Sequence, residues 1–343
     1  MIVLMSMKGI VLRKNDNQVV VETLPIPQVG VEQVLVKVIC TGICGTDIKL
    51  LKGQYHLREN IEKVVVGHEF VGMVVELGAD VDNVKKGDRI TAQPTMRSCG
   101  TCQYCHTGQF NLCKERTRIG FDSDGSFAEY IVLHKDQIYH IPDQISDEAA
   151  AMIEPLTVAV RAVYKAAIKP TDTVLITGPG TIGLLTLLVA KQHGCRTLVC
   201  GTKMDEKKLK IASALGADKV FMNDQWKEEE IGTEKISIVF ECAGHESAVN
   251  MGLELIVPKG QYIQVGTKSS KIEVDFMTVA YKELRITGSI AAIREDWIHA
   301  IELMVQCEDK AQLLIDKIYP LDKWEMGLES LLNNGGPKIL LQP

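Results

Sequence analysis

Four cysteines fall within fifteen residues, at Cys99, Cys102, Cys105 and Cys113. Thiolates at this close spacing can reach one ion from a single loop, and four of them complete a tetrahedral zinc site without an open position. Crowding of this kind favours a metal over a disulfide framework in a chain of 343 residues. The spacing therefore predicts a structural zinc ion in a lobe at residues 95–115, and the alternative is a loop of free thiols.

A histidine and a glutamate, His68 and Glu69, stand side by side in an apolar run that extends from Val64 to Val75. The β-branched flanks are typical of a strand. Burial of an imidazole and a carboxylate in such a strand is costly unless something compensates for it, and a metal ion does so. The pair indicates either a metal site or a core histidine beside an exposed glutamate.

A third chemical motif has the spacing of a dinucleotide-binding loop. It consists of Gly178, Pro179, Gly180, Thr181, Ile182 and Gly183. A strand is predicted before it, at Thr173–Thr177, and a helix after its first three residues, at Thr181–His193. Glycines there allow a tight turn and let the backbone approach a pyrophosphate at a helix N-terminus. The alternative is an ordinary strand-to-helix turn.

The end of the following strand bears on the choice between NAD and NADP. NAD sites usually carry an acidic residue about twenty residues after the glycine loop, where it binds the ribose hydroxyls. Gly201 stands at that place, and Thr202 and Lys203 follow it. No carboxylate would repel a 2′-phosphate and Lys203 could attract one, which favours NADP. Asp205 lies close enough to reverse this preference, and Lys203 as a solvated surface charge is the alternative.

The elements that must position these residues begin with a β-rich part. From Lys8 to about Asp143 the chain has short apolar or alternating strands broken by glycine, proline, asparagine and aspartate, which is typical of a β-barrel or sandwich. Cys44 is predicted in a tight turn, because glycines stand close to it on both sides. The strands are predicted at Val19–Thr23, Val34–Thr41, Val64–Val75, Asp88–Pro94, Ser126–Leu133 and Gln137–Ile141.

Strands and helices alternate from Thr173 to Ser289. Six short apolar strands are predicted at Thr173–Thr177, Thr197–Cys200, Lys219–Met222, Ile236–Phe240, Gln261–Val265 and Leu284–Gly288. The helices between them are predicted at Thr181–His193, Asp205–Leu215 and Glu246–Ile256. This alternation implies an α/β domain with a parallel, doubly wound sheet of six strands.

One further acidic residue, Glu154, precedes Pro155. Helical spacing is predicted at Ala149–Ile153 and again at Thr157–Ala167, and a proline between the two stretches predicts a break or a new helix start. Glu154 is therefore expected at a bend, from which its side chain could be aimed into a cleft.

The length predicts two domains, one at residues 1–155 together with 290–343 and the other at 156–289. The C-terminal part is expected to pack on the first domain. It is predicted to contain a helix at Asp296–Cys307, a strand near Leu313–Ile318, a helix at Trp324–Asn333 and a strand at Lys338–Leu341.

Composition limits the setting in which the protein works. The net charge of −6 does not indicate the basic surface that binds nucleic acid or an anionic membrane. The longest apolar run is too short to span a bilayer, and the first residues lack the features of a signal peptide. A cytoplasmic protein is expected.

Taken together, these residues resemble the zinc-containing medium-chain dehydrogenases, the superfamily of alcohol, sorbitol and threonine dehydrogenases. The stretch from Gly67 through His68 and Glu69 to Val81 fits the superfamily's zinc signature. The other matching motifs, in the superfamily's order, are Cys44-Gly45-Thr46-Asp47, Lys86-Gly87-Asp88-Arg89-Ile90, the four-cysteine lobe and the Gly178 loop. The resemblance covers nearly the whole chain, and it implies a GroES-like catalytic domain and a Rossmann domain.

The resemblance also implies a second, catalytic zinc ion. Cys44, His68 and a carboxylate would hold it, with water or substrate at the open position. Alcohol dehydrogenases proper use a cysteine as third ligand, but this chain has Glu154 there, so Glu69 and Glu154 compete for the role. Thr46 would pass on the hydroxyl proton.

Two further expectations follow from the resemblance. Many relatives have a histidine five residues after the zinc cysteine, and this chain has Lys49, so the relay beyond Thr46 stays open. Thr157 and the turn formed by Val265, Gly266 and Thr267 resemble segments that line the nicotinamide.

The implied function is hydride transfer between a secondary alcohol, most readily a polyol or sugar alcohol, and NAD or NADP. The alternatives are a threonine-type or general alcohol dehydrogenase, and a zinc- and nucleotide-binding protein without turnover. Tyr55 and His56 fall where relatives often face the substrate. The arginine that sorbitol dehydrogenases carry would fall near Ala291, with Arg294 three residues later. Relatives form dimers or tetramers, so a homo-oligomer is expected.

Overall fold

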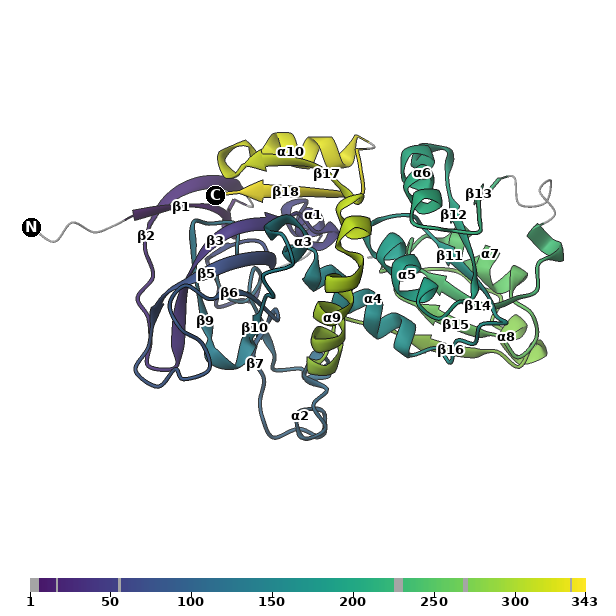
Figure 1. Ribbon diagram of the computed structural model, residues 1–343, viewed down its shortest axis with the longest axis horizontal. Helices are drawn as coiled ribbons and strands as arrows, with labels where there is room; N and C mark the ends of the chain where they lie inside the picture. The colour runs from purple at the N-terminus through teal and green to yellow at the C-terminus, as the bar shows by residue number, and fades with distance from the viewer. Residues whose placement is uncertain (1–5, 17, 55–56, 225–230, 268–270, 334) are drawn as a thin grey trace, which may run out of the picture. The chain divides into compact units, whose positions relative to one another are not determined.

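The computed structural model describes residues 6–16, 18–54, 57–224, 231–267, 271–333 and 335–343 (Figure 1). The chain divides into two compact units. The first unit consists of Met1–Glu154, Ile293–Glu308 and Ile315–Pro343, and the second of Pro155–Ala292 and Asp309–Leu314. This division differs from the boundaries predicted above at Pro155 and in two short stretches, 290–292 and 309–314, which cluster with the second unit.

The first unit is built on β-sheets. A three-stranded sheet has the order β2-β1-β4, and a larger sheet has the order β10-β6-β5-β3-β18-β17, with β9 also paired to β3. These strands are β1 (Ser6–Arg13), β2 (Val19–Pro25), β3 (Gln33–Gly42), β4 (Lys63–Val65), β5 (Glu69–Leu77), β6 (Arg89–Ala92), β9 (Tyr130–His134), β10 (Ile138–His140), β17 (Ile315–Pro320) and β18 (Lys338–Gln342). The C-terminal part thus packs on the first unit as predicted, because β18 pairs with β3.

Short elements complete the first unit. The strands β7 (Thr95–Arg97) and β8 (Thr117–Arg118) pair at the base of the cysteine lobe, which contains α2 (Gln103–His106). The remaining helices are α1 (Gly45–Leu51), α3 (Asp147–Ala150), most of α9 (Arg294–Gln312) and α10 (Trp324–Leu332).

The single strand predicted over Val64–Val75 is wrong in one respect. The structure breaks it into β4 and β5, with Gly67 and His68 between them. Gly67 has a positive φ of 91°, and a Cβ there would lie 2.1 Å from the Phe127 ring. Only glycine fits such a conformation and such a close contact, so the chain turns here. The turn places His68 outside the ladder and makes Glu69 the first residue of β5.

The helix start predicted next to Pro155 is confirmed, and it lies two residues before the proline. The helix α3 ends near Ala151, and α4 (Ile153–Tyr164) already includes Glu154 and Pro155 in its first turn. A proline is tolerated there because the first N–H groups of a helix have no partner within the helix. Glu154 is therefore fixed by a helix rather than by a kink.

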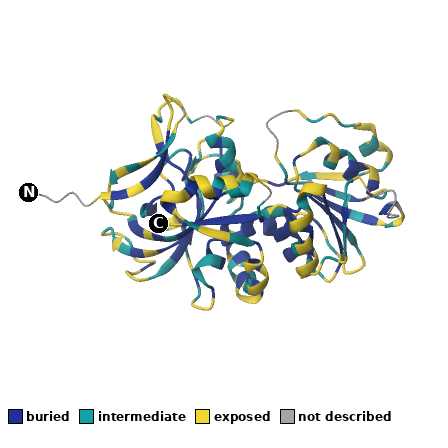
Figure 2. Ribbon diagram, turned by 90° about the horizontal axis from the view of Figure 1, so that it is seen from above, coloured by how far each residue is buried: buried dark blue, intermediate teal, exposed yellow. Residues whose placement is uncertain are grey.

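The second unit is a doubly wound parallel sheet with the order β13-β12-β11-β14-β15-β16, as predicted. Its strands are β11 (Thr173–Thr177), β12 (Arg196–Gly201), β13 (Lys219–Met222), β14 (Ile236–Glu241), β15 (Gln261–Gln264) and β16 (Arg285–Gly288). The helices are α4, α5 (Thr181–Lys191), α6 (Glu206–Ala214), α7 (Glu246–Leu255) and α8 (Met277–Tyr281). The central strands are buried, as are most residues of α4 and α5, while α6, α7 and α8 carry exposed residues (Figure 2).

Candidate functional site

The four cysteines of the lobe come together. Their sulfur atoms lie within 4.8 Å of one another, and all four are free thiols. The Cys102 and Cys105 sulfurs are 3.5 Å apart, and the Cys102 backbone N–H donates to the Cys99 sulfur at 3.3 Å. Hydrogen bonds from Thr101 and Cys102 lower the pKa of Cys99 to about 6, which favours the thiolate that a metal needs. The spacing and the donor set fit a zinc ion.

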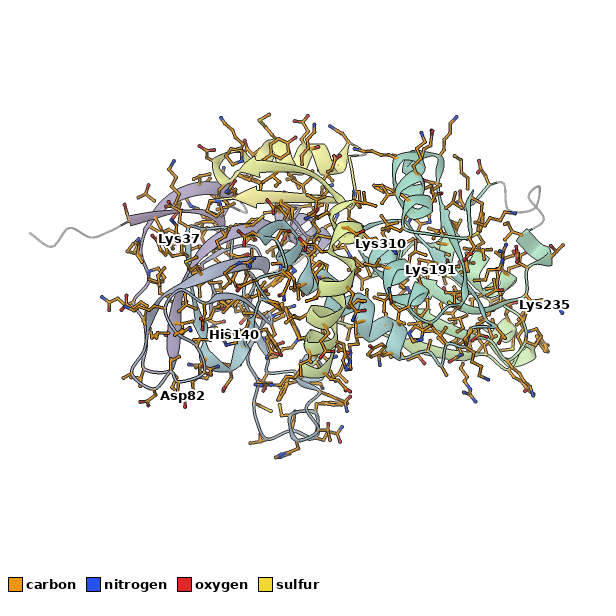
Figure 3. The ribbon with its side chains drawn as sticks, in the orientation of Figure 1. Lys37, Asp82, His140, Lys191, Lys235 and Lys310 are labelled. Carbon is orange, nitrogen blue, oxygen red and sulfur yellow. The ribbon has the colours of Figure 1, made fainter. Side chains whose placement is uncertain are left out.

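A second group forms around His68. Ligand atoms of Cys44, His68 and Glu69 lie within 4.8 Å of one another. Within the described part of the chain, this group and the four thiols are the sets of three or more histidine, cysteine or acidic residues at such spacing. Asp82 and His140, two side chains of the first unit that are labelled in Figure 3, belong to neither group.

The residues of this second group are positioned by two elements. Cys44 is the N-cap of α1, and its backbone N–H donates to Asp47 Oδ2 at 2.9 Å. The predicted turn around Cys44 is thus the start of a helix. Glu69 is paired across the sheet with Gly42, where a Cβ would lie 2.5 Å from Glu69 Oε2. The glycine therefore makes room for the carboxylate next to the Cys44 segment.

The imidazole of His68 lies beside the carboxylate of Asp47. Its Nδ1 lies 3.3 Å from Asp47 Oδ1, and Asp47 is fully buried. A carboxylate beside one ring nitrogen fixes the imidazole and leaves the other nitrogen for a metal. Burial opposes the charged form of His68, but Asp47 and Cys44 outweigh it and raise the pKa well above its usual value. The Phe121 ring packs against the imidazole at 5.2 Å.

Lys338, which the sequence analysis did not identify, completes the group. Its Nζ donates to Glu69 Oε2 at 2.5 Å and to the Ile43 carbonyl at 3.0 Å. Both side chains of the ion pair are 2% exposed. The one available signal was a lysine at the head of an apolar strand, because no local pattern joins positions 269 residues apart.

Glu154 is buried close to the same residues but lies outside the group that meets within 4.8 Å. Burial raises its pKa to about 7, His68 opposes this rise and Glu69 adds to it. Three buried carboxylates, from Asp47, Glu69 and Glu154, thus lie close to the candidate ligands, and Lys338 pairs with one of them, Glu69. The excess of buried negative charge, together with a thiol and an imidazole, fits a divalent cation.

Thr46 lies beside the Cys44 thiol. Its Oγ1 is 3.6 Å from the Cys44 sulfur, and its backbone N–H points to the same sulfur at 3.5 Å. The hydroxyl is therefore close to the candidate metal ligands and can exchange a proton with a group bound there.

The Gly178 loop is built as the motif requires. Gly178 has φ of 88°, and a Cβ there would lie 2.8 Å from Ala243. A Cβ on Gly183 would lie 2.0 Å from the Gly178 carbonyl oxygen. Gly180 is the N-cap of α5, and Thr181 and Ile182 begin that helix. Backbone N–H groups at this helix start can receive an anion.

The Asp205 carboxylate, in the segment after β12, accepts hydrogen bonds from neighbouring residues. Thr202 donates to Asp205 Oδ2 through its N–H at 3.0 Å and its hydroxyl at 2.8 Å, and Lys208 donates to Oδ1 at 3.1 Å. Although burial favours the neutral acid, these donors lower the pKa of Asp205. Lys203 is exposed beside it. The carboxylate that could have reversed the cofactor preference is bound within its own loop.

Other predicted residues are placed as follows. Thr157 is fully buried in α4, and Val265, Gly266 and Thr267 follow β15. Arg294 donates to the Asp136 carbonyl at 3.0 Å. Tyr55 and His56 lie outside the described residues.

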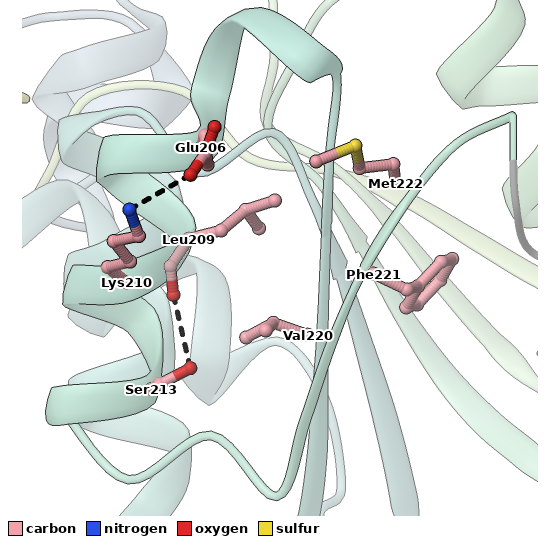
Figure 4. Close-up of a pocket in the computed structure, with 7 residues that line it drawn as sticks. All are labelled: Glu206, Leu209, Lys210, Ser213, Val220, Phe221 and Met222. Atoms are coloured by element: carbon pink, nitrogen blue, oxygen red, sulfur yellow. Dashed lines mark hydrogen bonds and ion pairs between the residues drawn. The ribbon is translucent and has the colours of Figure 1, made fainter.

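A surface groove of about 250 Å³ lies between α6 and β13. Its charged residues, Glu206 and Lys210, pair with each other at 2.9 Å (Figure 4). Its other lining residues are Leu209, Ser213, Val220, Phe221 and Met222. None of the predicted site residues lines it.

Fold and site together define a class: a nucleotide-binding oxidoreductase with two candidate zinc centres. Sequence profiles agree with this, since one for the alcohol dehydrogenase GroES-like domain matches residues 30–143 and one for zinc-binding dehydrogenases matches residues 181–306. The chain belongs to the zinc-binding dehydrogenase family and is an oxidoreductase.

Its relatives are similar over nearly their whole length. The chain is 36% identical to a sorbitol dehydrogenase of Halalkalibacterium halodurans, covering 94% of this chain and 95% of the relative. It is 38% identical to a D-arabitol-phosphate dehydrogenase of Enterococcus avium, covering 93% and 92%. An L-threonine 3-dehydrogenase of Pseudoalteromonas translucida is 31% identical, covering 98% and 99%.

Solved structures are similar as well. A zinc-binding dehydrogenase from Sinorhizobium meliloti 1021, bound to NADP, has a TM-score of 0.88 at 30% identity, covering 99% of this chain and 100% of that one. An alcohol dehydrogenase from Escherichia coli CFT073, complexed with NADH, has a TM-score of 0.88 at 27% identity, covering 98% and 99%.

Proposed function

We propose that the protein is a zinc-dependent dehydrogenase that transfers a hydride between a secondary hydroxyl of a polyol or sugar alcohol and NADP. The observation that carries this proposal is the group of half-buried Cys44 with buried His68 and Glu69, which has the Thr46 hydroxyl beside it. A thiol, an imidazole and a carboxylate leave one position of a tetrahedral zinc ion open, as catalysis requires.

We assign Glu69, rather than Glu154, as the third protein ligand of this catalytic zinc. Glu69 is the carboxylate with an oxygen within 4.8 Å of the ligand atoms of Cys44 and His68, and its Oε2 pairs with Lys338. Glu154 would then stand next to the ion and face the open position. A second, structural zinc ion would be held by Cys99, Cys102, Cys105 and Cys113.

The side chains of this group then have separate tasks. When bound, zinc supplies Lewis acidity that lowers the pKa of the substrate hydroxyl, and the nicotinamide accepts the hydride. Asp47 keeps the His68 imidazole in one orientation. Thr46 accepts the proton that leaves the substrate hydroxyl and passes it outward. Lys338 balances the carboxylate of Glu69, so that the buried site does not accumulate negative charge.

The substrate class rests on the carboxylates and on the relatives. Glu154 stands where alcohol dehydrogenases proper have a cysteine, and the relatives named above act on sorbitol and on D-arabitol phosphate. The threonine dehydrogenase among the relatives supports a hydroxy-amino acid as the second candidate. A protein that binds zinc and nucleotide without turnover is the third, and the open metal position argues against it.

A substrate panel tests these candidates. Zinc-loaded protein is expected to reduce NADP with sorbitol-type polyols or their phosphates faster than with ethanol, 2-propanol or threonine, followed at the nicotinamide absorbance. Fastest turnover of threonine would favour the hydroxy-amino acid candidate. No turnover of any panel member would favour the binding protein. Parallel assays with NAD measure the cofactor preference.

We infer the preference for NADP from Gly201, Lys203 and the occupied Asp205. Replacing Gly201 by aspartate would be a poor test of it. A Cβ at position 201 would lie 3.0 Å from both Asp205 and Pro179, so the substitution would also disturb the glycine loop. Substitution of Lys203 is cleaner because its side chain is exposed.

We also propose a homo-oligomer in which the edge strand β16 is the contact. Among the described strands β16 pairs only with β15, and an unpaired edge can pair with a second copy. Large apolar residues on and near it are exposed by 43% to 85%, namely Phe276, Met277, Tyr281, Ile286 and Ile290. Such exposure is typical of an interface.

Ile286→Asp is expected to convert the oligomer to monomers in sedimentation velocity, because a carboxylate would be buried in the contact. Ile318→Asp is a matched control, since Ile318 is also 43% exposed and lies on β17, the edge of the other sheet. If only Ile318→Asp dissociates the oligomer, the interface is formed by β17 and not by β16.

No helix among the described residues is both long enough and apolar enough to cross a membrane. We place the protein in the cytoplasm, because all ten cysteines are free thiols, which is typical of a reducing compartment.

A further inference from the structure

A fully buried carboxylate, Glu241, lies at the carboxyl end of β14 and belongs to neither zinc group. It is aligned in the sheet with Thr177 of β11 on one side and with Gln264 of β15 on the other. In a doubly wound sheet, ligands bind beyond the carboxyl ends of the strands. Glu241 therefore lies directly beneath the predicted dinucleotide site.

The two carboxylate oxygens face different segments. Oε1 accepts from the N–H groups of Ala243 and Gly244 at 2.9 and 2.8 Å, and the Thr177 hydroxyl is 3.5 Å away. Oε2 accepts from Gln264 Nε2 at 2.5 Å and from Gly244 N–H at 3.1 Å. Burial raises the pKa of Glu241, but these donors oppose the rise and favour the carboxylate.

The same residue holds the turn after β15 through its backbone. The Glu241 carbonyl accepts from Val265 N–H at 2.9 Å and from Gly266 N–H at 2.7 Å. Gln264, which donates to the Glu241 carboxylate, also donates to the Gly266 carbonyl at 2.8 Å. The turn is thus tied to Glu241 directly and through Gln264.

Close packing leaves this turn little freedom. A Cβ on Gly266 would lie 2.6 Å from Glu241 Oε2 and 2.3 Å from the Gly244 nitrogen. Gly244 has φ of 63°, and a Cβ there would lie 2.8 Å from the Thr267 carbonyl oxygen. The segments 243–244 and 265–267 therefore move together with Glu241.

We propose that Glu241 is a positioning residue for the nicotinamide half of the cofactor, because its Oε2 and Gln264 fix the turn Val265–Gly266–Thr267. This inference rests on the proposed dinucleotide function and on the assignment of that turn to the nicotinamide. The adenosine half is assigned to other segments, the Gly178 loop and residues 201–203.

The two oxygens allow a selective substitution. In Glu241→Gln, the amide oxygen can keep the place of Oε1 and its three donors. The amide NH₂ then takes the place of Oε2 and meets the NH₂ group of Gln264, so donor faces donor. The side-chain link through Gln264 is lost, while Ala243 and Gly244 stay bound to the amide oxygen and the N–H groups of Val265 and Gly266 stay bound to the backbone carbonyl of residue 241.

The experiment measures binding of NADPH and of 2′,5′-ADP, a fragment without nicotinamide, to the zinc-loaded full chain by calorimetry. Glu241→Gln is expected to weaken NADPH binding by about tenfold, as for one lost hydrogen bond to a charged group, and to change 2′,5′-ADP binding less than about twofold. Gln264→Met removes the same link by changing its donor, and it is likewise expected to weaken binding of NADPH much more than binding of 2′,5′-ADP. Lys203→Ala is a control with a different expected pattern, because it should weaken binding of NADPH and binding of 2′,5′-ADP to the same extent.

Rescue separates positioning from a general loss of structure. The double variant Glu241→Gln with Gln264→Glu again places an acceptor opposite a donor at the 241–264 pair, but the Gly266 carbonyl then faces a carboxylate oxygen instead of its donor. It is therefore expected to recover the melting temperature lost in Glu241→Gln, while NADPH binding stays as weak as in the single variants. Equal losses for both ligands in Glu241→Gln and Gln264→Met, or no loss in either, would overturn the inference. If the unaltered protein binds neither ligand, the dinucleotide function itself fails.

Discussion

Cys44→Ser is expected to lower turnover by about a thousandfold or more while leaving one zinc ion bound per chain. The proposed catalytic zinc supplies several kcal/mol of charge stabilisation, and each 1.4 kcal/mol corresponds to about a factor of ten in rate. A serine hydroxyl is a far weaker zinc ligand than a thiolate. The substitution is small, and Cys44 is only half-buried, so the fold is expected to remain.

The measurement combines turnover on the best panel substrate with metal analysis of the purified protein. Cys102→Ser is the complementary variant and should lose the other zinc ion, with a lower melting temperature as its main effect. Cys195→Ser is the matched control, because this buried thiol donates to the Ala190 carbonyl at 3.4 Å and a hydroxyl can do the same. Retained turnover in Cys44→Ser would remove Cys44 from the catalytic site.

Lys338→Met is expected to lower the free energy of unfolding by about 3–5 kcal/mol. The Glu69 carboxylate and the Lys338 ammonium are both buried, and in zinc-free protein removal of Lys338 leaves the Glu69 charge buried without compensation. The Ile43 carbonyl would lose a hydrogen bond as well. Burial alone favours the neutral amine, yet Glu69 outweighs it and raises the pKa of Lys338, so the ammonium form persists at neutral pH.

Urea denaturation monitored by circular dichroism measures this change. Lys317→Met is the control, because Lys317 is exposed on the adjacent strand β17 and its loss should change stability by less than about 0.5 kcal/mol. The variant Glu69→Gln with Lys338→Met removes both charges and is expected to be more stable than Lys338→Met alone. A loss below about 1 kcal/mol in Lys338→Met would show that water or another group already compensates Glu69.

Local patterns carried most of what could be predicted. The strands and helices of the second unit follow from short apolar runs between turn residues, and the predicted sheet of six parallel strands is confirmed. The four-cysteine spacing was sufficient because all four residues lie on one short lobe. The glycine loop could be recognised since its strand, turn and helix are contiguous in sequence.

What escaped prediction depends on contacts between distant residues. The break at Gly67 is required by the Phe127 ring, which is 60 residues further on and leaves no signal near the glycine. Glu241 lies one residue beyond the strand predicted at Ile236–Phe240, and its side-chain partners come from β11, from β15 and from the loop after β14. Lys338 had no sequence pattern to connect it with Glu69.

The pairing of β18 with β3 bears on how the chain is assembled during synthesis. Lys338 and Ile43 are 295 positions apart, and the whole second unit lies between them in the sequence as an insertion. Domains usually fold in the order in which they leave the ribosome. Here the inserted unit can be finished while the unit that began first still waits for its last strand. The proposed catalytic centre is therefore the final part of the molecule to mature, and Glu69, which is made early, remains without its lysine until then.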